Sequence, residues 1–137
     1  MGLVHAEITL KNATDLADAR REIISEKEIR SVTVDALVDT GSGTLGINEE
    51  IREKLGLGIQ GLRSAELANG GKQICRLTEP VEVYWKDRFC TCRALVIPGA
   101  KEALLGAIPL EDMDLAVHPA RNELVGAHGD EIICMLK

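Results

Sequence analysis

The chain has 137 residues, a length that suits one compact domain and is too short for two of ordinary size. It carries 16 basic and 22 acidic residues without a basic stripe, which argues against a nucleic acid as partner. No apolar run approaches the roughly 20 residues that span a bilayer, and the N-terminus alternates in polarity, unlike a signal peptide. The sequence therefore predicts a single cytoplasmic domain over residues 1–137, with no membrane or nucleic-acid partner.

The first part of the chain predicts two strands separated by a helical segment. Residues 4–11 alternate between apolar and polar side chains, as a half-buried strand does. Residues 12–24 carry apolar side chains at helical spacing, with Thr14 as the expected N-cap, and a turn with a short helical segment fits them equally well. Residues 28–38 form a stronger strand pattern, because every second residue from 32 to 38 is Val or Ala.

A short helix is predicted over residues 48–55, where several independent signals agree. Asn48 is a favourable N-cap, acidic residues fill the first turn, and Gly56 provides the usual stop.

After residue 64 the pattern changes to strands and turns. The Asn-Gly-Gly-Lys stretch at residues 69–72 is a hairpin turn signal, because glycine adopts positive φ without strain. Residues 103–110 are largely apolar, with a glycine in the middle of the stretch. The chain as a whole is expected to be mostly β, with one or two short helices. The expected strands are 64–68 paired with 73–77, 81–85 with 89–97 around a turn at Lys86-Asp87-Arg88, 115–117 with 123–125, and a terminal strand over 132–136.

The four cysteines are expected to be reduced, since an even count without a secretory signal is weak evidence for disulfides. Cys90 and Cys92 have strand spacing, and Ala94 and Val96 continue the same face, which predicts that both thiols are buried. A metal site would need a nearby histidine or a second cysteine pair, so neither a metal nor another cofactor is expected.

The stretch most informative about function begins at Asp39. An apolar strand leads directly into Asp39-Thr40-Gly41-Ser42-Gly43, which places one carboxylate in a tight turn. Gly41 leaves room beside the carboxylate, and its N–H is in a position to bond it. The hydroxyls of Thr40 and Ser42 are candidates to fix the loop.

This stretch resembles the active-site segment of the retropepsin-like aspartic proteases, in which two apolar residues precede Asp-Thr-Gly. A second family element, two apolar residues followed by glycine, occurs 65 residues later as Leu104-Leu105-Gly106. Between them, the glycine-rich hairpin occupies the place of the substrate-covering flap of that family. The nearest resemblance is to the free-standing, single-lobe prokaryotic members, although Gly43, Gly46 and a polar flap depart from the pattern.

The resemblance implies a closed, β-barrel-like acid protease lobe with one or two short helices, and it implies a role for each matched residue. Segment 104–106 is expected to pack on the active-site loop and to lead into a short helix over residues 109–113. The expected catalytic residues are Asp39, Thr40 and Gly41, supported by Ser42, Leu104, Leu105 and Gly106, with Asn69, Gly70 and Gly71 in the flap.

Aspartic proteases need two facing carboxylates that share a proton, one acting as base and the other as acid. The chain has one Asp-Thr-Gly, so the resemblance implies a homodimer in which Asp39 of each copy flanks a lytic water. The expected activity is an endopeptidase acting on peptides or proteins, and strand 132–136 is a candidate for the dimer interface, as in the related viral enzymes.

Three other interpretations remain open from the sequence. Asp39-x-Gly-x-Gly also matches the phosphate loop of actin-type ATPases, but those proteins need a much longer chain. The second interpretation is a non-catalytic binding module, a dimer with the protease fold that holds peptides, or only itself, because fold does not fix function. The third is a metal carrier that uses Cys90 and Cys92.

Overall fold

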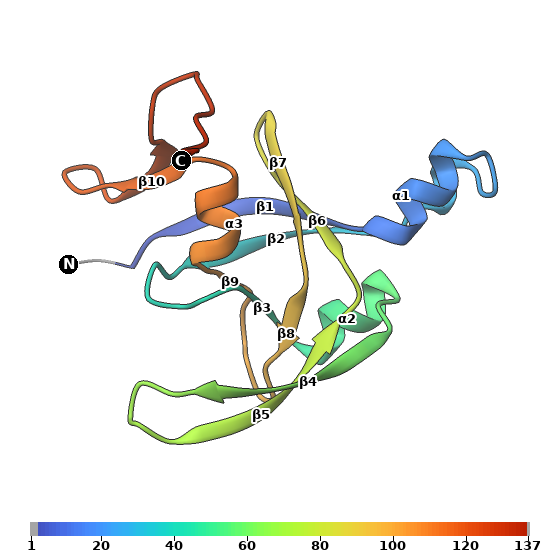
Figure 1. The fold of residues 1–137 in the computed structure, drawn as a ribbon, viewed down its shortest axis with the longest axis horizontal. Coiled ribbons are helices and arrows are strands. Elements are labelled where there is room, and N and C mark those ends of the chain that lie inside the picture. Colours follow the sequence, from blue (N-terminus) through green and yellow to red (C-terminus); the bar gives the residue numbers. More distant parts are fainter. Residues whose placement is uncertain (1–2, 137) are drawn as a thin grey trace.

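Strands dominate the computed structural model, which describes residues 3–136 (Figure 1). The mostly β prediction is therefore confirmed, together with the presence of a few short helices. The helices are α1 Ala13–Arg20, the 3-10 turn η1 Glu26–Glu28, α2 Glu49–Leu55 and α3 Ala107–Asp112. The strands are β1 His5–Asn12, β2 Ser31–Val38, β3 Leu45–Ile47, β4 Ile59–Glu66, β5 Lys72–Thr78, β6 Val81–Trp85, β7 Arg88–Cys92, β8 Ala94–Val96, β9 Leu104–Leu105, β10 Leu115–His118 and β11 Glu123–Gly126.

Nine strands form one sheet in the order β4-β5-β8-β3-β9-β2-β1-β6-β7, and β10 pairs with β11 as a separate hairpin. Strand β2 lies in the interior of the sheet, antiparallel to β1 on one side and parallel to β9 on the other. Within residues 3–136, strand pairing does not connect the two outer strands, β4 and β7, so the predicted barrel closure is not seen there.

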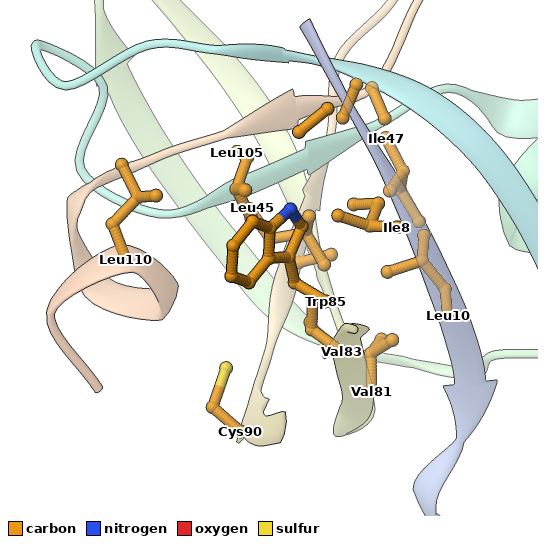
Figure 2. Close-up of a cluster of buried hydrophobic side chains, with 14 of the residues drawn as sticks. Ile8, Leu10, Leu45, Ile47, Val81, Val83, Trp85, Cys90, Leu105 and Leu110 are labelled. Atoms are coloured by element: carbon orange, nitrogen blue, oxygen red, sulfur yellow. The ribbon is translucent and has the colours of Figure 1, made fainter. Parts of the chain in front are cut away.

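The core is one cluster of aliphatic side chains around Trp85, which is 8% exposed (Figure 2). β1 contributes Ile8 and Leu10, and its alternating burial is the pattern that predicted this strand. Burying such a side chain stabilises the fold by about 1.5–3 kcal/mol. The cluster therefore holds together elements that are distant in sequence, including β3, β6, β9 and α3.

Helix α1 differs from its prediction at both ends. Asn12, not Thr14, is the N-cap, because its side-chain oxygen accepts the N–H of Asp15 at 3.0 Å. The helix stops at Arg20, since the chain turns at Glu22, which has a φ of 61°. The apolar face predicted through residue 24 is thus not helical at its end, and Ile23 is 67% exposed.

The buried residue of α1 is a carboxylate, Asp15. It accepts three hydrogen bonds from Arg30, from the backbone N–H at 3.0 Å and from two guanidinium nitrogens at 2.9 Å. These bonds to Arg30 hold the pKa of Asp15 below its ordinary value. Asn12 adds a second polar connection, because its amide donates to the Leu55 carbonyl at the end of α2.

Helix α2 matches its prediction. Asn48 caps it by accepting the N–H of Ile51 at 2.9 Å, and Gly56 ends it with a φ of 62°. Positive φ is where glycine has no steric penalty, which explains the stop.

Three predictions in the second half of the chain are wrong. Residues 132–136 do not form a strand in the structure. The stretch predicted as one strand over 89–97 is divided at Arg93 into β7, which pairs with β6, and β8, which pairs with β3 and β5. Arg88, expected in the turn before it, belongs to β7 and is buried.

None of the helices within residues 3–136 is long and apolar enough to cross a membrane.

Replacing Asp15 with alanine should lower the free energy of unfolding by about 1–2 kcal/mol, because Arg30 loses its charge-assisted hydrogen bonds. Asp18→Ala, in the same helix, is the matched control and should have a smaller effect. Chemical denaturation of the three proteins measures this, and equal stabilities would contradict a structural role for the Asp15–Arg30 pair.

Candidate active site

Asp39 follows the last residue of β2 in the interior of the sheet. Its N–H donates to the Leu105 carbonyl of β9 at 3.0 Å, and the preceding Val38 N–H donates to Val4 at 2.8 Å. Neighbouring chain segments on both sides therefore fix the backbone that carries the carboxylate.

The loop after Asp39 closes around the carboxylate as predicted. The Gly41 N–H donates to Asp39 Oδ1 at 3.1 Å, and the Ser42 N–H donates to the Asp39 carbonyl at 3.1 Å. The predicted steric need for Gly41 is not seen within the chain, because an added Cβ would lie 3.4 Å from Oδ1, an ordinary contact. The side chain of Asp39 is half-buried, and Thr40 is exposed. Among residues 3–136, neither the Thr40 nor the Ser42 hydroxyl has a hydrogen-bond partner, so the locking role expected of them is not seen.

Gly106 packs directly against this loop, as the resemblance implied. A Cβ on Gly106 would overlap the Thr44 carbonyl oxygen and lie 2.7 Å from that of Ser42. The next two residues donate backbone hydrogen bonds to the loop, Ala107 to Ser42 at 2.7 Å and Ile108 to Gly43 at 3.1 Å. Helix α3 therefore begins on the loop, two residues earlier than the predicted 109–113.

Strands β4 and β5 form the predicted hairpin, longer at its base than the sequence indicated. Gly70 has a φ of 85°, and the Gly71 N–H donates to the Asn69 side chain at 2.8 Å, so the turn has the expected chemistry. The hairpin and the Asp39 loop together line a cleft of about 510 Å³. The cleft residues are Asp39, Gly41 and Ser42 from the loop, Ala65–Ala68, Gln73 and Cys75 from the hairpin, and Leu95, Ile97 and Leu104 from the sheet.

The hairpin residues that line the cleft are not those singled out from the sequence. Asn69, Gly70 and Gly71 occupy the turn and are exposed, outside the cleft lining. The register pairs Ala65 with Gln73, which places both side chains on one face of the hairpin. The two-residue periodicity of a strand indicates which side chains share a face, but the sequence does not indicate which face of the hairpin lines the cleft.

No family model and no curated protein matches this chain. Among solved structures, it is similar to a retropepsin-like aspartic protease from Rickettsia conorii. The similarity covers 64% of this chain and 70% of the other, at 20% identity and a TM-score of 0.50. The chain has the retropepsin-like fold. At this level of identity, the similarity shows the fold alone.

Asp39 is the carboxylate that the loop after β2 contributes to the cleft. Glu66 also borders the cleft. It pairs with Lys72 in the hairpin register, and both residues are exposed. This pair directly follows the Ala65–Gln73 pair along the strands, so the side chains of the two pairs alternate between the faces of the hairpin. One carboxylate is able to activate a water or to protonate a leaving group, and peptide hydrolysis requires both steps. A single chain therefore supplies one of the two carboxylates expected for peptide hydrolysis.

An ion pair attaches the base of the β4–β5 hairpin to α2. Glu49 accepts from Arg52 at 2.6 and 2.8 Å and from Arg76 of β5 at 2.5 Å. Its hydrogen bonds with Arg52, and then with Arg76, lower the pKa of Glu49 to about 2. This connection fixes the base of the β4–β5 hairpin, and within residues 3–136 no ion pair holds its tip.

The cysteines are free thiols in the structure. Cys90 is buried as predicted, whereas Cys92 is half-buried because it ends β7. The hydrogen bond with Cys92, together with burial, raises the pKa of Cys90, which keeps it a neutral thiol at physiological pH. Among residues 3–136 no three His, Cys, Asp or Glu side chains gather as metal ligands would.

Replacing Gly106 with alanine should lower the melting temperature and any activity of the site, because the new methyl group has to displace the loop backbone. Gly43→Ala is the matched control, since a Cβ there meets nothing within 4 Å. Thermal unfolding of both variants measures the difference. Equal melting temperatures would show that the contact between Gly106 and the loop does not constrain the fold.

Glu49→Gln should destabilise the protein at neutral pH and much less in acid. Because the folded-state pKa of Glu49 is lowered from its ordinary 4.5 to about 2, its contribution is complete above the ordinary value. That contribution disappears as the pH falls through about 2. Melting curves of wild type and variant at several pH values test this, and a difference that is constant from pH 7 down to pH 2 would contradict it.

Proposed function

We propose that the protein is an aspartic endopeptidase that acts as a homodimer, with Asp39 of each copy contributing one catalytic carboxylate. The observation that carries the proposal is the cleft in which Asp39 faces the inner side of the β4–β5 hairpin on a retropepsin-like fold. Hydrogen bonds within this chain fix the Asp39 loop, so the carboxylate is preorganised before substrate arrives.

The proposed chemistry uses the two Asp39 side chains in opposite protonation states. The ionised carboxylate takes a proton from a water between them, while the protonated partner donates a hydrogen bond to the peptide carbonyl. The water oxygen bonds to the carbonyl carbon, and the carbon–nitrogen bond then breaks as the amide nitrogen receives the proton that the first carboxylate took from the water. The products are a carboxylic acid and an amine, and the pair of carboxylates is ready for another cycle.

The shape of the cleft favours an extended peptide as substrate. Leu95, Ile97 and Leu104 give it an aliphatic wall, and the β4–β5 hairpin and the Asp39 loop contribute the rest of its lining. An extended peptide is able to pair its main chain with hairpin strands while its alternate side chains enter the apolar wall. In this proposal the hairpin acts as a flap, and Asn69, Gly70 and Gly71 form its movable tip.

Asp39→Asn should abolish peptide hydrolysis and leave the fold intact, because an amide is nearly isosteric with the carboxylate but cannot act as a base. Cleavage of a peptide library by wild type and variant, followed by mass spectrometry between about pH 3 and pH 8, measures the activity. Wild-type activity should have a bell-shaped pH dependence on the acidic side of neutrality, since the site needs one proton on the carboxylate pair. Circular dichroism controls for folding, and Asp35→Asn, an exposed position on β2, is the matched control.

Retained cleavage by the Asp39 variant would remove Asp39 from the mechanism. A folded wild type that is inert over the whole pH range would instead support the binding-module alternative, a dimer that holds peptides without cleaving them.

A further inference from the structure

Gln73 is the amide among the hairpin side chains that line the cleft. It pairs with Ala65 across the hairpin, and both residues are half-buried. The next residue of β5, Ile74, is 66% exposed on the outer face, and Cys75 is buried again on the inner face. The alternation in burial shows that the inner face is the one turned toward the cleft. The neighbours of Gln73 on that face, Ala65 and Cys75, are small and leave room beside the amide.

The Gln73 amide is free to bind a ligand. Within residues 3–136 it makes no hydrogen bond, whereas the other glutamine of the chain, Gln60, accepts one from Arg93 at 2.6 Å. A carboxamide offers two N–H donors and a carbonyl acceptor. A peptide that covers Gln73 removes water from these groups, and polar groups left unpaired cost free energy. Gln73 therefore favours a peptide side chain that both donates and accepts.

The aliphatic wall beside Gln73 adds a second requirement. Leu77 of β5 pairs with Leu95 of β8, so Leu95 lies on the same face of the sheet as Cys75 and Gln73. Leu95 belongs to the aliphatic wall of the cleft. A side chain that suits both neighbours has methylene groups for the wall and a hydrogen-bonding end for Gln73. Glutamine and, with a shorter stem, asparagine have this composition.

The charges of the cleft argue against an ionised side chain at this place. The charged residues in its lining are Asp39 and Glu66, both acidic. A glutamate of the peptide would be repelled by these carboxylates. A lysine only donates hydrogen bonds and would leave the N–H groups of Gln73 without an acceptor. An uncharged carboxamide meets neither penalty.

We propose that Gln73 is a specificity-determining residue that selects peptides with a glutamine or asparagine side chain against the inner face of β5. The inference rests on the proposed function, because it names the class of substrate that the same cleft takes. Gln73 contacts the peptide in this account and has no part in the proton transfers of Asp39.

The test begins with the cleavage profile of the wild type on a peptide library, which gives the position that prefers a carboxamide. Two peptides that differ only there are then compared, one with glutamine and one with methionine, which has a similar length and volume. The wild type should cleave the glutamine peptide with a kcat/KM about three- to ten-fold higher, the effect of one neutral hydrogen bond. A profile without any carboxamide preference would overturn the inference.

Two variants change the amide and keep its size. Gln73→Met should remove the preference, so that the two peptides are cleaved equally or the methionine peptide is favoured. Gln73→Glu should gain activity on the matching lysine peptide by about ten-fold, because a charge-assisted hydrogen bond replaces the neutral one. Such a gain would not follow from a merely structural role. Ile74→Glu is the matched control, since it places the same carboxylate on the outer face and should keep the wild-type preference.

Peptide affinity provides a second measurement that needs no cleavage. Fluorescence anisotropy measures binding of the same peptides to Asp39→Asn, alone and combined with each change at residue 73. Cleavage with preferences that neither Gln73 variant alters would overturn the inference and leave the proposed function intact. A wild type that is inert, but whose affinity for the glutamine peptide depends on residue 73, would contradict the protease activity and support the role of Gln73. A protein that neither cleaves nor binds any peptide would overturn both.

Discussion

The parallel pairing of β2 with β9 is the constraint on which the rest of the site depends. Backbone hydrogen bonds from Leu37 to Ala103 and from Asp39 to Leu105 hold together two segments that are distant in sequence. The pairing ends where β2 becomes the Asp39 loop and β9 becomes Gly106. The loop therefore leaves the sheet at a fixed position, and α3 closes over it because Gly106 has no side chain. The same pairing also requires the aliphatic core beneath it, since Leu105 is fully buried.

The cleft follows from that arrangement together with the hairpin. The loop provides one carboxylate, and the hairpin provides a mostly uncharged inner face whose base is attached to α2 through Glu49. The elements that bear the chemistry are thus fixed, whereas the hairpin tip extends beyond them. In the proposed function, the hairpin, attached at its base, acts as a flap over a ligand that lies extended along its strands. Peptide hydrolysis by a dimer remains our proposal for how this geometry is used.

Much of this arrangement was predictable because it depends on local sequence patterns. The alternation in β1 and β2, the cap at Asn48, the stop at Gly56 and the turn at Gly70 are each encoded within a few residues. The Asp-Thr-Gly motif likewise indicated the loop, and the structure places Gly106 against it.

The features that sequence reasoning missed depend on contacts between distant residues. Thr14 looked like a cap, but Asn12 takes that role because its amide also binds Leu55 of α2. Arg88 looked like a turn residue, and only the fold brings the carbonyls of residues 113, 114, 129 and 131 around it. Residues 132–136 have the composition of a strand, but in the described structure they form none, and the Ile133 N–H donates to the Asp114 carboxylate.

The central claim is that two copies of Asp39 form one catalytic site, and subunit mixing tests it most directly. Wild type and Asp39→Asn are combined in different ratios at constant total concentration, allowed to exchange subunits, and assayed for peptide cleavage. If both carboxylates are needed, activity follows the square of the wild-type fraction, so that an equal mixture keeps about a quarter of the activity. Activity in direct proportion to the wild-type fraction would show that one chain is sufficient and would contradict the account.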